Sequence, residues 1–225
     1  MMNVIAIDGP AASGKSSVAT AIAEALDAVH INTGSMYRAI GWKTVLAGID
    51  PEKEPETFAE KLAAVQMKFV RTGNGDPELE VDGVFPGEQL RTEAASAAAS
   101  KVATIPAVRE RLVELQREMA GNDLLVMEGR DIGTVVFPDA KYKFFLTASP
   151  MERARRRLLQ DGLQLSPELL QKTADAIAER DRVDSTRAVS PLKQAEDAIL
   201  IDSSTLTKEE TVQEILQWIR KKENV

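Results

Sequence analysis

The sequence predicts an α/β fold in which a parallel β-sheet is covered by helices. Short, strongly apolar segments that are typical of buried strands alternate with longer helical patterns along the 225 residues. A glycine-rich loop joins the first of these strands to the first helix, an arrangement common in parallel sheets. Hydrophobic residues make up 44% of the chain, which is enough to form a packed core.

Five segments are expected to form the parallel sheet, because each is short, apolar and rich in residues that favour strands. The segment at 124–127 is almost entirely apolar, as expected for a strand that is buried on both faces. The five expected strands cover residues 4–7, 29–32, 124–127, 142–146 and 198–201.

The first and last helices are expected to cover this sheet. The first helical pattern begins at about Ser17. The last helix is expected to begin at Thr207, because Glu210 three residues later completes a capping box. Its apolar face consists of Val212, Ile215, Leu216 and Ile219.

An insertion is expected between the second and third strands. Residues 67–70 and 79–81 predict a small antiparallel pair of strands, with turns at 72–77 and at Asp82-Gly83. An alanine-rich helix is expected over 93–101.

Two further helices are expected after the fourth strand. Ser149 predicts the first helix start, with Glu152 as its capping glutamate, and Ser166 starts another helix that runs to about Arg182. We expect this pair to form a mobile lid that excludes water and brings cations to a transferring phosphoryl group. The first of the two helices carries Arg153, Arg155, Arg156 and Arg157.

The glycine-rich loop matches the phosphate-loop pattern G-x-x-x-x-G-K-[ST] without a gap, between a strand and a helix. Its backbone N–H groups and the helix N-terminus suit phosphate oxygens. Lys15 is expected to reach the β- and γ-phosphates, and the Ser16 hydroxyl to bind Mg²⁺ directly. A chance glycine-rich turn would explain the motif less well. The residues expected to bind ATP are Gly9, Pro10, Ala11, Ala12, Ser13, Gly14, Lys15, Ser16 and Ser17.

Polar residues also follow the second and third strands, at the carboxyl ends where parallel sheets bind ligands. Arg38 could clamp an acceptor phosphate, or be the exposed arginine of a capped helix. In the block that begins at Glu128, this carboxylate could hold Mg²⁺ through water. Arg130 could bind an acceptor phosphate, and Asp131 could accept a hydrogen bond from an exocyclic amine. A local ion pair would be the structural alternative.

Acids and arginines alternate over 179–187, which suits a nucleotide as well as a helix end with surface ion pairs. The net charge of −7 argues against nucleic-acid binding, whereas local arginine clusters suggest a small anionic ligand. The chain has no cysteine, and neither a leader segment nor a membrane-spanning stretch is apparent. We therefore expect a cytoplasmic protein without nucleic-acid or membrane partners.

From end to end the sequence resembles the bacterial cytidylate kinases. The block from Gly129 to Pro138 is the most specific feature of this resemblance. The other segments that carry it are 7–10, 33–38, 90–92, 100–103, 108–109 and 180–192. The resemblance implies an α/β P-loop kinase with a five-stranded parallel sheet flanked by helices, a small antiparallel nucleoside monophosphate (NMP)-binding insertion and a helical lid.

The resemblance also implies a division of residues 1–225, taken as a single kinase unit. The core would comprise 1–61, 101–148 and 188–225, the NMP-binding insertion about 62–100, and the lid about 149–187.

Roles follow from the resemblance for individual residues. The cytosine would be read by Ser100, Arg109 and Asp131. The ribose would contact Arg180 and Asp184. The acceptor phosphate would be surrounded by Arg38, Arg130 and Arg187. Thr33 and Tyr37 would line the same pocket. The expected catalytic residues are Lys15, Arg130, Arg153, Arg157 and Arg187. Two positions depart from the family pattern, because Glu128 and Asn32 stand where the family has aspartate.

The implied reaction transfers the γ-phosphate of ATP, with Mg²⁺, to CMP or dCMP, and gives CDP or dCDP plus ADP. A P-loop kinase for another nucleoside monophosphate or a small metabolite is the nearest alternative. A nucleotide-dependent regulatory NTPase is less favoured, because the chain has neither an N-K-x-D nor a D-x-x-G motif. A non-catalytic nucleotide-binding subunit is disfavoured by the intact Lys15 and Ser16. A monomer is expected, since a lid needs room to move.

Overall fold

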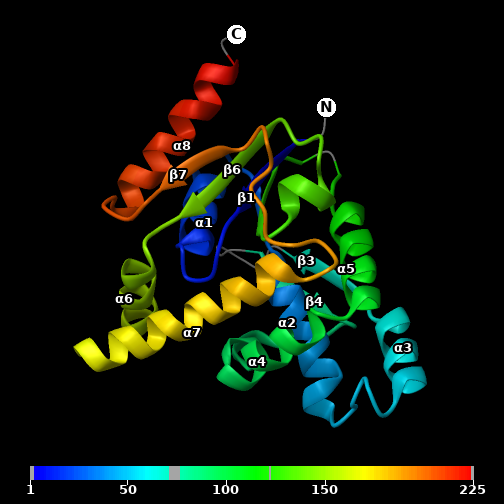
Figure 1. Ribbon diagram of the computed structural model, residues 1–225. Coiled ribbons are helices and arrows are strands. Elements are labelled where there is room, and N and C mark those ends of the chain that lie inside the picture. Colours follow the sequence, from blue (N-terminus) through cyan, green and yellow to red (C-terminus); the bar gives the residue numbers. More distant parts are fainter. Residues whose placement is uncertain (1–2, 71–76, 122, 224–225) are drawn as a thin grey trace. The chain divides into compact units, whose positions relative to one another are not determined.

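The computed structural model describes residues 3–70, 77–121 and 123–223 (Figure 1). The chain divides into two compact units. Unit 1 comprises Met1–Val29 and Asn122–Val225, and unit 2 comprises His30–Gly121.

The main sheet has five strands in the order β2-β5-β1-β6-β7. The central strand, β1 (Val4–Asp8), pairs in parallel with β5 (Leu125–Gly129) and with β6 (Tyr142–Thr147). The edge strand β7 (Ile199–Asp202) pairs in parallel with β6, and β2 (Val29–Asn32) is the other edge. The five-stranded parallel sheet predicted from the sequence is confirmed, with strand ends that differ by no more than two residues.

The register of the sheet places the last residue of β1 beside the ends of its neighbours. Asp8 pairs with Gly129 of β5 and with Phe145 of β6. Because parallel strands end at the same edge, the residues that follow β1 and β5 start from neighbouring positions.

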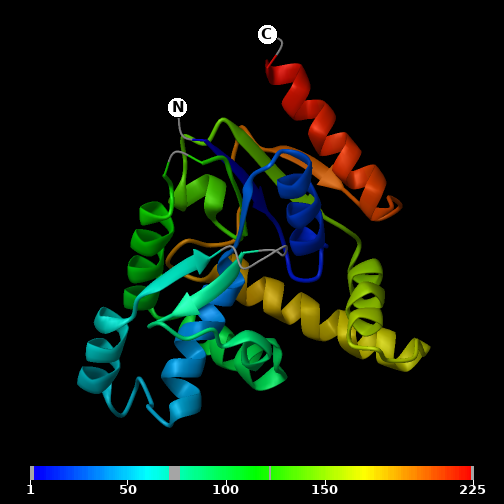
Figure 2. The same ribbon diagram turned by 180° about the vertical axis from the view of Figure 1, so that it is seen from behind.

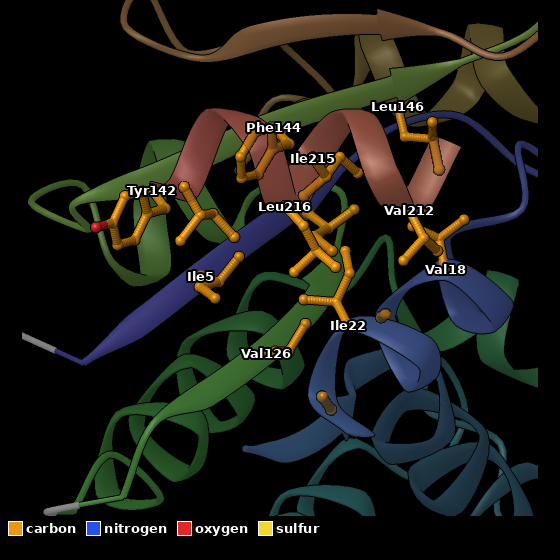
Figure 3. Close-up of a cluster of buried hydrophobic side chains, with 14 of the residues drawn as sticks. Ile5, Val18, Ile22, Val126, Tyr142, Phe144, Leu146, Val212, Ile215 and Leu216 are labelled. Atoms are coloured by element: carbon orange, nitrogen blue, oxygen red, sulfur yellow. The ribbon is translucent and has the colours of Figure 1, made fainter. Parts of the chain in front are cut away.

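Two helices cover one face of this sheet and close the core of unit 1. Figure 3 shows side chains of α1 (Lys15–Ala25) and α8 (Lys208–Glu223) pointing toward those of the strands. Each buried aliphatic side chain contributes about 1.5–3 kcal/mol, so this cluster is a main source of stability. Its members include Ile5, Val18, Ile22, Val126, Phe144, Val212, Ile215 and Leu216.

The cap of the last helix forms as the sequence predicts. The Thr207 N–H donates to Glu210 Oε2 at 2.8 Å, and the Glu210 N–H donates to Thr207 Oγ1 at 3.1 Å. This reciprocal pair satisfies two N–H groups at the start of α8 that have no partner within the helix.

Helices α6 (Pro150–Gln160) and α7 (Pro167–Thr186) pack against each other (Figure 1). Ser149 caps α6 as predicted, because its Oγ accepts from the Glu152 N–H at 3.3 Å. The prediction that Glu152 closes a capping box is wrong: its carboxylate binds arginines of α6, and Ser204 Oγ accepts from the Ser149 N–H instead. Ser166 caps α7 as predicted. This helix ends at Thr186, four residues beyond the expected end at Arg182.

Unit 2 holds a two-stranded sheet with helices beside and behind it in the view of Figure 2. Strands β3 (Met67–Val70) and β4 (Glu78–Val81) are antiparallel, as predicted. Most of the turn expected over 72–77 lies outside the described residues. The tight turn expected at Asp82-Gly83 is confirmed, because both residues have positive φ angles and Val81 and Val84 exchange hydrogen bonds.

The helices of unit 2 bury a separate apolar core, which includes Met36, Ile40, Phe58 and Leu112. The helix predicted over 93–101 is present as α4. The helical elements of this unit are α2 (Thr33–Lys43), η1 (Val45–Ala47), α3 (Pro55–Ala64), η2 (Gly87–Arg91), α4 (Glu93–Val102) and α5 (Pro106–Glu118). Within the described residues of both units, no helix combines the length and apolar character needed to cross a membrane.

Candidate active site

The glycine-rich loop lies between β1 and α1 and depends on unusual backbone angles. Gly9 has φ 153°, and a Cβ atom there would lie 2.0 Å from the carbonyl oxygen of Leu146. Gly14 has φ 91° and precedes the first residue of α1. Ala12 adopts φ 57°, a left-handed conformation that costs a non-glycine residue about 1–2 kcal/mol. The loop is therefore held in shape by its surroundings.

Lys15, predicted to bind phosphates, is buried at the end of this loop. Its Nζ donates to the Pro10 carbonyl at 2.6 Å and to Ser13 Oγ at 3.3 Å. Burial, and after it the nearby Arg130, holds the pKa of the Lys15 ammonium well below its usual range. Carboxylates act in the opposite direction, from Glu128, Asp8 and Asp181. A poorly hydrated ammonium next to another cation is stabilised strongly by an arriving polyanion.

Asp8 is a site residue that the sequence interpretation missed. Its buried carboxylate accepts from the N–H groups of Ile132 at 2.8 Å and Gly133 at 2.7 Å. Burial raises the pKa of the Asp8 carboxyl to about 6, although these two N–H groups lower it. The available signal was an acid directly before the loop, at the end of a buried strand.

The contacts of Asp8 anchor the block predicted to bind the acceptor. Ile132 and Gly133 begin η3 (Ile132–Val136), a short π-helix directly after Arg130 and Asp131. Asp131 is buried at the residue that precedes this helix. The carboxylate at the end of β1 thus fixes the backbone that carries these two predicted site residues.

Arg130 and Arg187, both predicted to hold the acceptor phosphate, meet at one carboxylate. Arg130 Nε donates to Asp184 Oδ2 at 2.9 Å, and Arg187 NH1 donates to Asp184 Oδ1 at 3.3 Å. Arg187 Nε also donates to the Ser190 carbonyl at 2.7 Å. Asp184 therefore fixes the two guanidinium groups next to each other.

A third arginine, Arg180, lies close enough to Arg130 and Asp184 for their charges to act on it. Partial loss of hydration lowers the pKa of Arg180, although the residue as a whole is exposed, and the neighbouring Arg130 adds to the shift. An arginine keeps its charge under all ordinary conditions, and the Asp184 and Asp181 carboxylates offset part of the repulsion between these cations. This arrangement suits a phosphate.

The residues proposed for Mg²⁺ are compatible with that ion. Ser16 is exposed at the start of α1, and Glu128 is buried in β5 close enough to Lys15 to raise its pKa. Both offer oxygen, the donor that Mg²⁺ requires. Among the described residues, no group of three or more acids, histidines or cysteines forms a dedicated metal cage. Mg²⁺ bound with nucleotide phosphates needs only one or two protein ligands.

The two lid arginines predicted to be catalytic have different surroundings. Arg153 is buried, and its guanidinium donates to the carbonyls of Ala148 and Ala11 and pairs with Asp181. The side chain of Arg157 is 40% exposed and forms an ion pair with Asp161, the residue directly after α6. Because the guanidinium of Arg153 is already bound to protein acceptors, a structural role in the site is favoured for this residue.

Arg156 and Asp181 also contact the phosphate loop. The sequence places Arg156 among the lid arginines, but it predicts neither of these two contacts. Arg156 NH1 donates to the Ser13 carbonyl at 3.2 Å, and the Ala11 N–H donates to Asp181 Oδ1 at 3.0 Å. The sequence offered a signal for Arg156, because it lies three residues after Arg153 and residues three apart share one face of a helix.

In unit 2, the start of α2 carries several predicted acceptor residues. Thr33 is buried, while Tyr37 and Arg38 are partly exposed. Asn32 caps this helix, with its Oδ1 accepting from the Ser35 N–H at 3.1 Å. Because aspartate and asparagine cap helices equally well, the departure from the family pattern at Asn32 leaves the local structure intact.

Ser100 and Arg109 are the predicted cytosine-binding residues in unit 2, and Arg109 contacts the ring of Tyr37. The Arg109 guanidinium lies 5.3 Å from the centre of the Tyr37 ring, within cation–π range. Ser100 is exposed on α4, and its Oγ donates to the Ser96 carbonyl at 3.1 Å. The roles of these residues in binding a base stay predictions.

The family model described as cytidylate kinase matches residues 5–221. The protein named cytidylate kinase in Pelotomaculum thermopropionicum is 47% identical over 213 residues, which make up 94% of this chain and 93% of that protein. The protein of the same name in Mycobacterium leprae is 43% identical over 220 residues, with coverage of 97% and 96%.

Among solved structures, an uncharacterized protein from Eubacterium ventriosum has a TM-score of 0.52 to this chain. The match covers 96% of this chain and 98% of that one at 12% identity. At this level of identity the likeness concerns the fold alone.

Proposed function

Because the chain belongs to the cytidylate kinase family and is a CMP kinase, we propose that its phosphate loop holds ATP while a second set of residues holds CMP or dCMP. The observation that carries this assignment is the set of cations around Lys15 and Asp184. Two polyanions have to approach each other in the reaction, and their repulsion has to be offset.

For the donor, we propose that residues Gly9 to Ser17 bind the ATP phosphates. The backbone N–H groups of the loop and the start of α1 would take phosphate oxygens. Lys15 would exchange its contact with the Pro10 carbonyl for the β- and γ-phosphates. Ser16 would hold Mg²⁺ directly and Glu128 through water, and the ion would neutralise charge on the phosphates.

For the acceptor, we propose that Arg38, Arg130 and Arg187 bind the phosphate of CMP. The cytosine would be read by Ser100, Arg109 and Asp131, with Thr33 and Tyr37 beside them. Arg180 and Asp184 would meet the ribose. Asp184 would then serve twice, because it also fixes the guanidinium groups of Arg130 and Arg187.

In the proposed reaction, an oxygen of the CMP phosphate attacks the γ-phosphorus of ATP. The bond from that phosphorus to the bridging oxygen breaks, and CDP and ADP are formed. No strong base is needed, because the attacking oxygen is already anionic. Catalysis therefore rests on positioning and on stabilising charge.

Among the lid arginines, we propose Arg157 as the one that reaches the transferring phosphoryl group. Its ion pair with Asp161 lies at the surface, where such pairs contribute about 0–1 kcal/mol and break readily. Arg153 would support the loop instead. Monomeric state and cytoplasmic location stay predictions, which size-exclusion chromatography and cell fractionation would test.

The test of the proposed function is ADP formation from Mg·ATP with CMP, dCMP, UMP, AMP, GMP or no acceptor. We expect turnover with CMP and dCMP and little without an acceptor. In the Asp131→Ala variant, we expect the KM for CMP to rise far more than the KM for ATP. Equal losses for both substrates would mean that Asp131 is structural, and acceptor-independent hydrolysis would contradict the acceptor assignment.

A further inference from the structure

Three charged residues of α6 and α7 hold the phosphate loop through its peptide groups. We call Arg153, Arg156 and Asp181 the loop bracket. The Ala11 N–H donates to Asp181 Oδ1 at 3.0 Å, and the Ala11 carbonyl accepts from Arg153 NH1 at 3.1 Å. Arg153 also pairs with Asp181, so the N–H and the carbonyl of Ala11 are bound by the two members of one ion pair.

Arg156 contacts the loop at Ser13, two residues after Ala11. Arg156 NH1 donates to the Ser13 carbonyl at 3.2 Å and to Ser203 Oγ at 2.9 Å. Its NH2 donates to the Ser203 carbonyl at 2.6 Å, and its Nε to Glu152. Four contacts fix this guanidinium, which therefore presents a stationary charge to the loop.

The bracket encloses the strained residue of the loop. Ala12, with φ 57°, lies between Ala11 and Ser13, the two residues that the bracket holds. A left-handed alanine persists only where its neighbours fix the backbone on both sides. The bracket provides this restraint, and so keeps the loop in the form that can receive phosphates.

The charges of the bracket also act on the N–H groups that follow. A hydrogen bond from an arginine to a carbonyl polarises the peptide unit, and the N–H of the next residue becomes a stronger donor. The Ser13 carbonyl shares its peptide unit with the N–H of Gly14, at the N-terminus of α1. That position attracts anions already.

We propose that Arg156, together with Arg153 and Asp181, is a positioning residue for the ATP phosphates, acting through the backbone of the phosphate loop. This inference rests on the proposed assignment of that loop to ATP. It gives Arg153 and Arg156 a role in donor binding that requires no contact with the nucleotide.

Arg155 provides a matched control for Arg156. Both arginines extend from α6 and bind the Glu152 carboxylate, at 2.8 and 2.9 Å. Arg155 is 47% exposed, and Glu152 is the partner that its side chain contacts, whereas Arg156 also reaches Ser13. The two alanine variants remove the same charge from the same helix but only one removes the loop contact.

The experiment compares Arg156→Ala, Arg156→Lys and Arg155→Ala by steady-state kinetics, by calorimetric titration with Mg·ADP and by thermal unfolding. For Arg156→Ala we expect the KM for ATP and the Kd for ADP to rise about tenfold, the scale of one hydrogen bond to a charged group. The KM for CMP should change less than about twofold, as should all constants of Arg155→Ala, whose exposed pair is weak. For Arg156→Lys, the rise in the KM for ATP and in the Kd for ADP should lie between the values of the two alanine variants.

Equal changes in the two KM values, or equal effects of the two alanine variants, would overturn the inference. If Arg156→Ala does not fold, the lysine variant and Asp181→Asn provide the same comparison. A wild-type protein that forms no ADP with CMP would contradict the proposed function itself. An active wild type with an unchanged Arg156→Ala variant would contradict the bracket alone.

Discussion

Gly9 shows how a single absent side chain can determine the position of the phosphate loop. A Cβ at this residue would lie 2.0 Å from the Leu146 carbonyl, so the loop approaches β6 more closely than any other residue type allows. The loop starts directly after a fully buried strand and cannot shift without disturbing the sheet.

We therefore expect Gly9→Ala to lower the free energy of unfolding by at least about 3 kcal/mol, the upper range for overpacking. Gly48→Ala is the matched control, because Gly48 also has a positive φ of 85° but no atom lies within 4 Å of the added Cβ. It should cost only the backbone strain of about 1–2 kcal/mol. Urea denaturation of both variants checks this, and equal losses would mean that contact with Leu146 is unimportant.

Asp8 makes stability depend on pH in an unusual direction. Burial raises the pKa of its carboxyl to about 6, from 3.8. The folded protein thus holds this proton more tightly than the unfolded chain does. The resulting stabilisation is complete below about pH 4 and is lost as the pH rises through about 6.

We expect the stability advantage of the wild type over Asp8→Asn to fall by about 3 kcal/mol between about pH 4 and about pH 7, because asparagine does not titrate. Urea denaturation at a series of pH values measures this difference. Asp197→Asn should show the opposite slope and at lower pH, because a hydrogen bond from Lys143 lowers the pKa of Asp197 below 3.8, so that the stabilisation by Asp197 is lost only as the pH falls below about 5. A difference between wild type and Asp8→Asn that does not change with pH would contradict the assignment.

The sequence revealed the residues of the site that belong to local motifs, and missed those that act across long separations. Lys15 and Arg130 lie in recognisable blocks. Asp8 bonds to Ile132, and Arg156 to Ser13, across more than a hundred residues in each case. No spacing within the chain encodes such pairs, because they arise only when the parallel strands are assembled.

At the scale of secondary structure, the caps were predictable because their partners lie three residues apart. Strands were predictable from apolar runs for a similar reason. The π-helix η3 had no such signal, since the N–H groups of its first two residues bind a carboxylate at the end of a different strand. The wrong prediction for Glu152 has the same origin, because arginines compete for its carboxylate.

The capping box of α8 offers a test at this scale. We expect Thr207→Ala to lower the free energy of unfolding by about 1 kcal/mol, because the N–H of Glu210 loses its acceptor. The kinetic constants should not change, since α8 contributes to the core and to none of the proposed contacts. Thr205→Ala, two residues earlier and also exposed, is the control. A kinetic defect in Thr207→Ala would show that α8 affects the site.

At the scale of the whole molecule, the two units divide the proposed contacts unequally. The residues proposed to bind ATP all belong to unit 1, whereas some of the residues proposed to bind CMP belong to unit 1 and others to unit 2. Hydrogen exchange can detect this division, because a bound ligand slows local opening where it makes contacts.

We expect Mg·ADP alone to slow exchange in the phosphate loop and α1, and to leave unit 2 unchanged. CMP alone should slow exchange in α2, α4 and α5 of unit 2 and around Arg130 in unit 1. Helix α3 carries none of the proposed contacts and serves as an internal reference. Protection by CMP in only one unit would contradict the assignment of its binding residues.

The path of the chain through unit 1 has a consequence for the protein during its synthesis. The central strand β1 precedes unit 2 in the chain, while β5, β6 and β7 follow it. At about 5–20 residues per second, a ribosome needs on the order of ten seconds to reach β6 after β1 has been made. Unit 2 is continuous and can fold during that interval. The five residues of β1, four of them apolar, therefore stay without their neighbouring strands until the second half of the chain has been made.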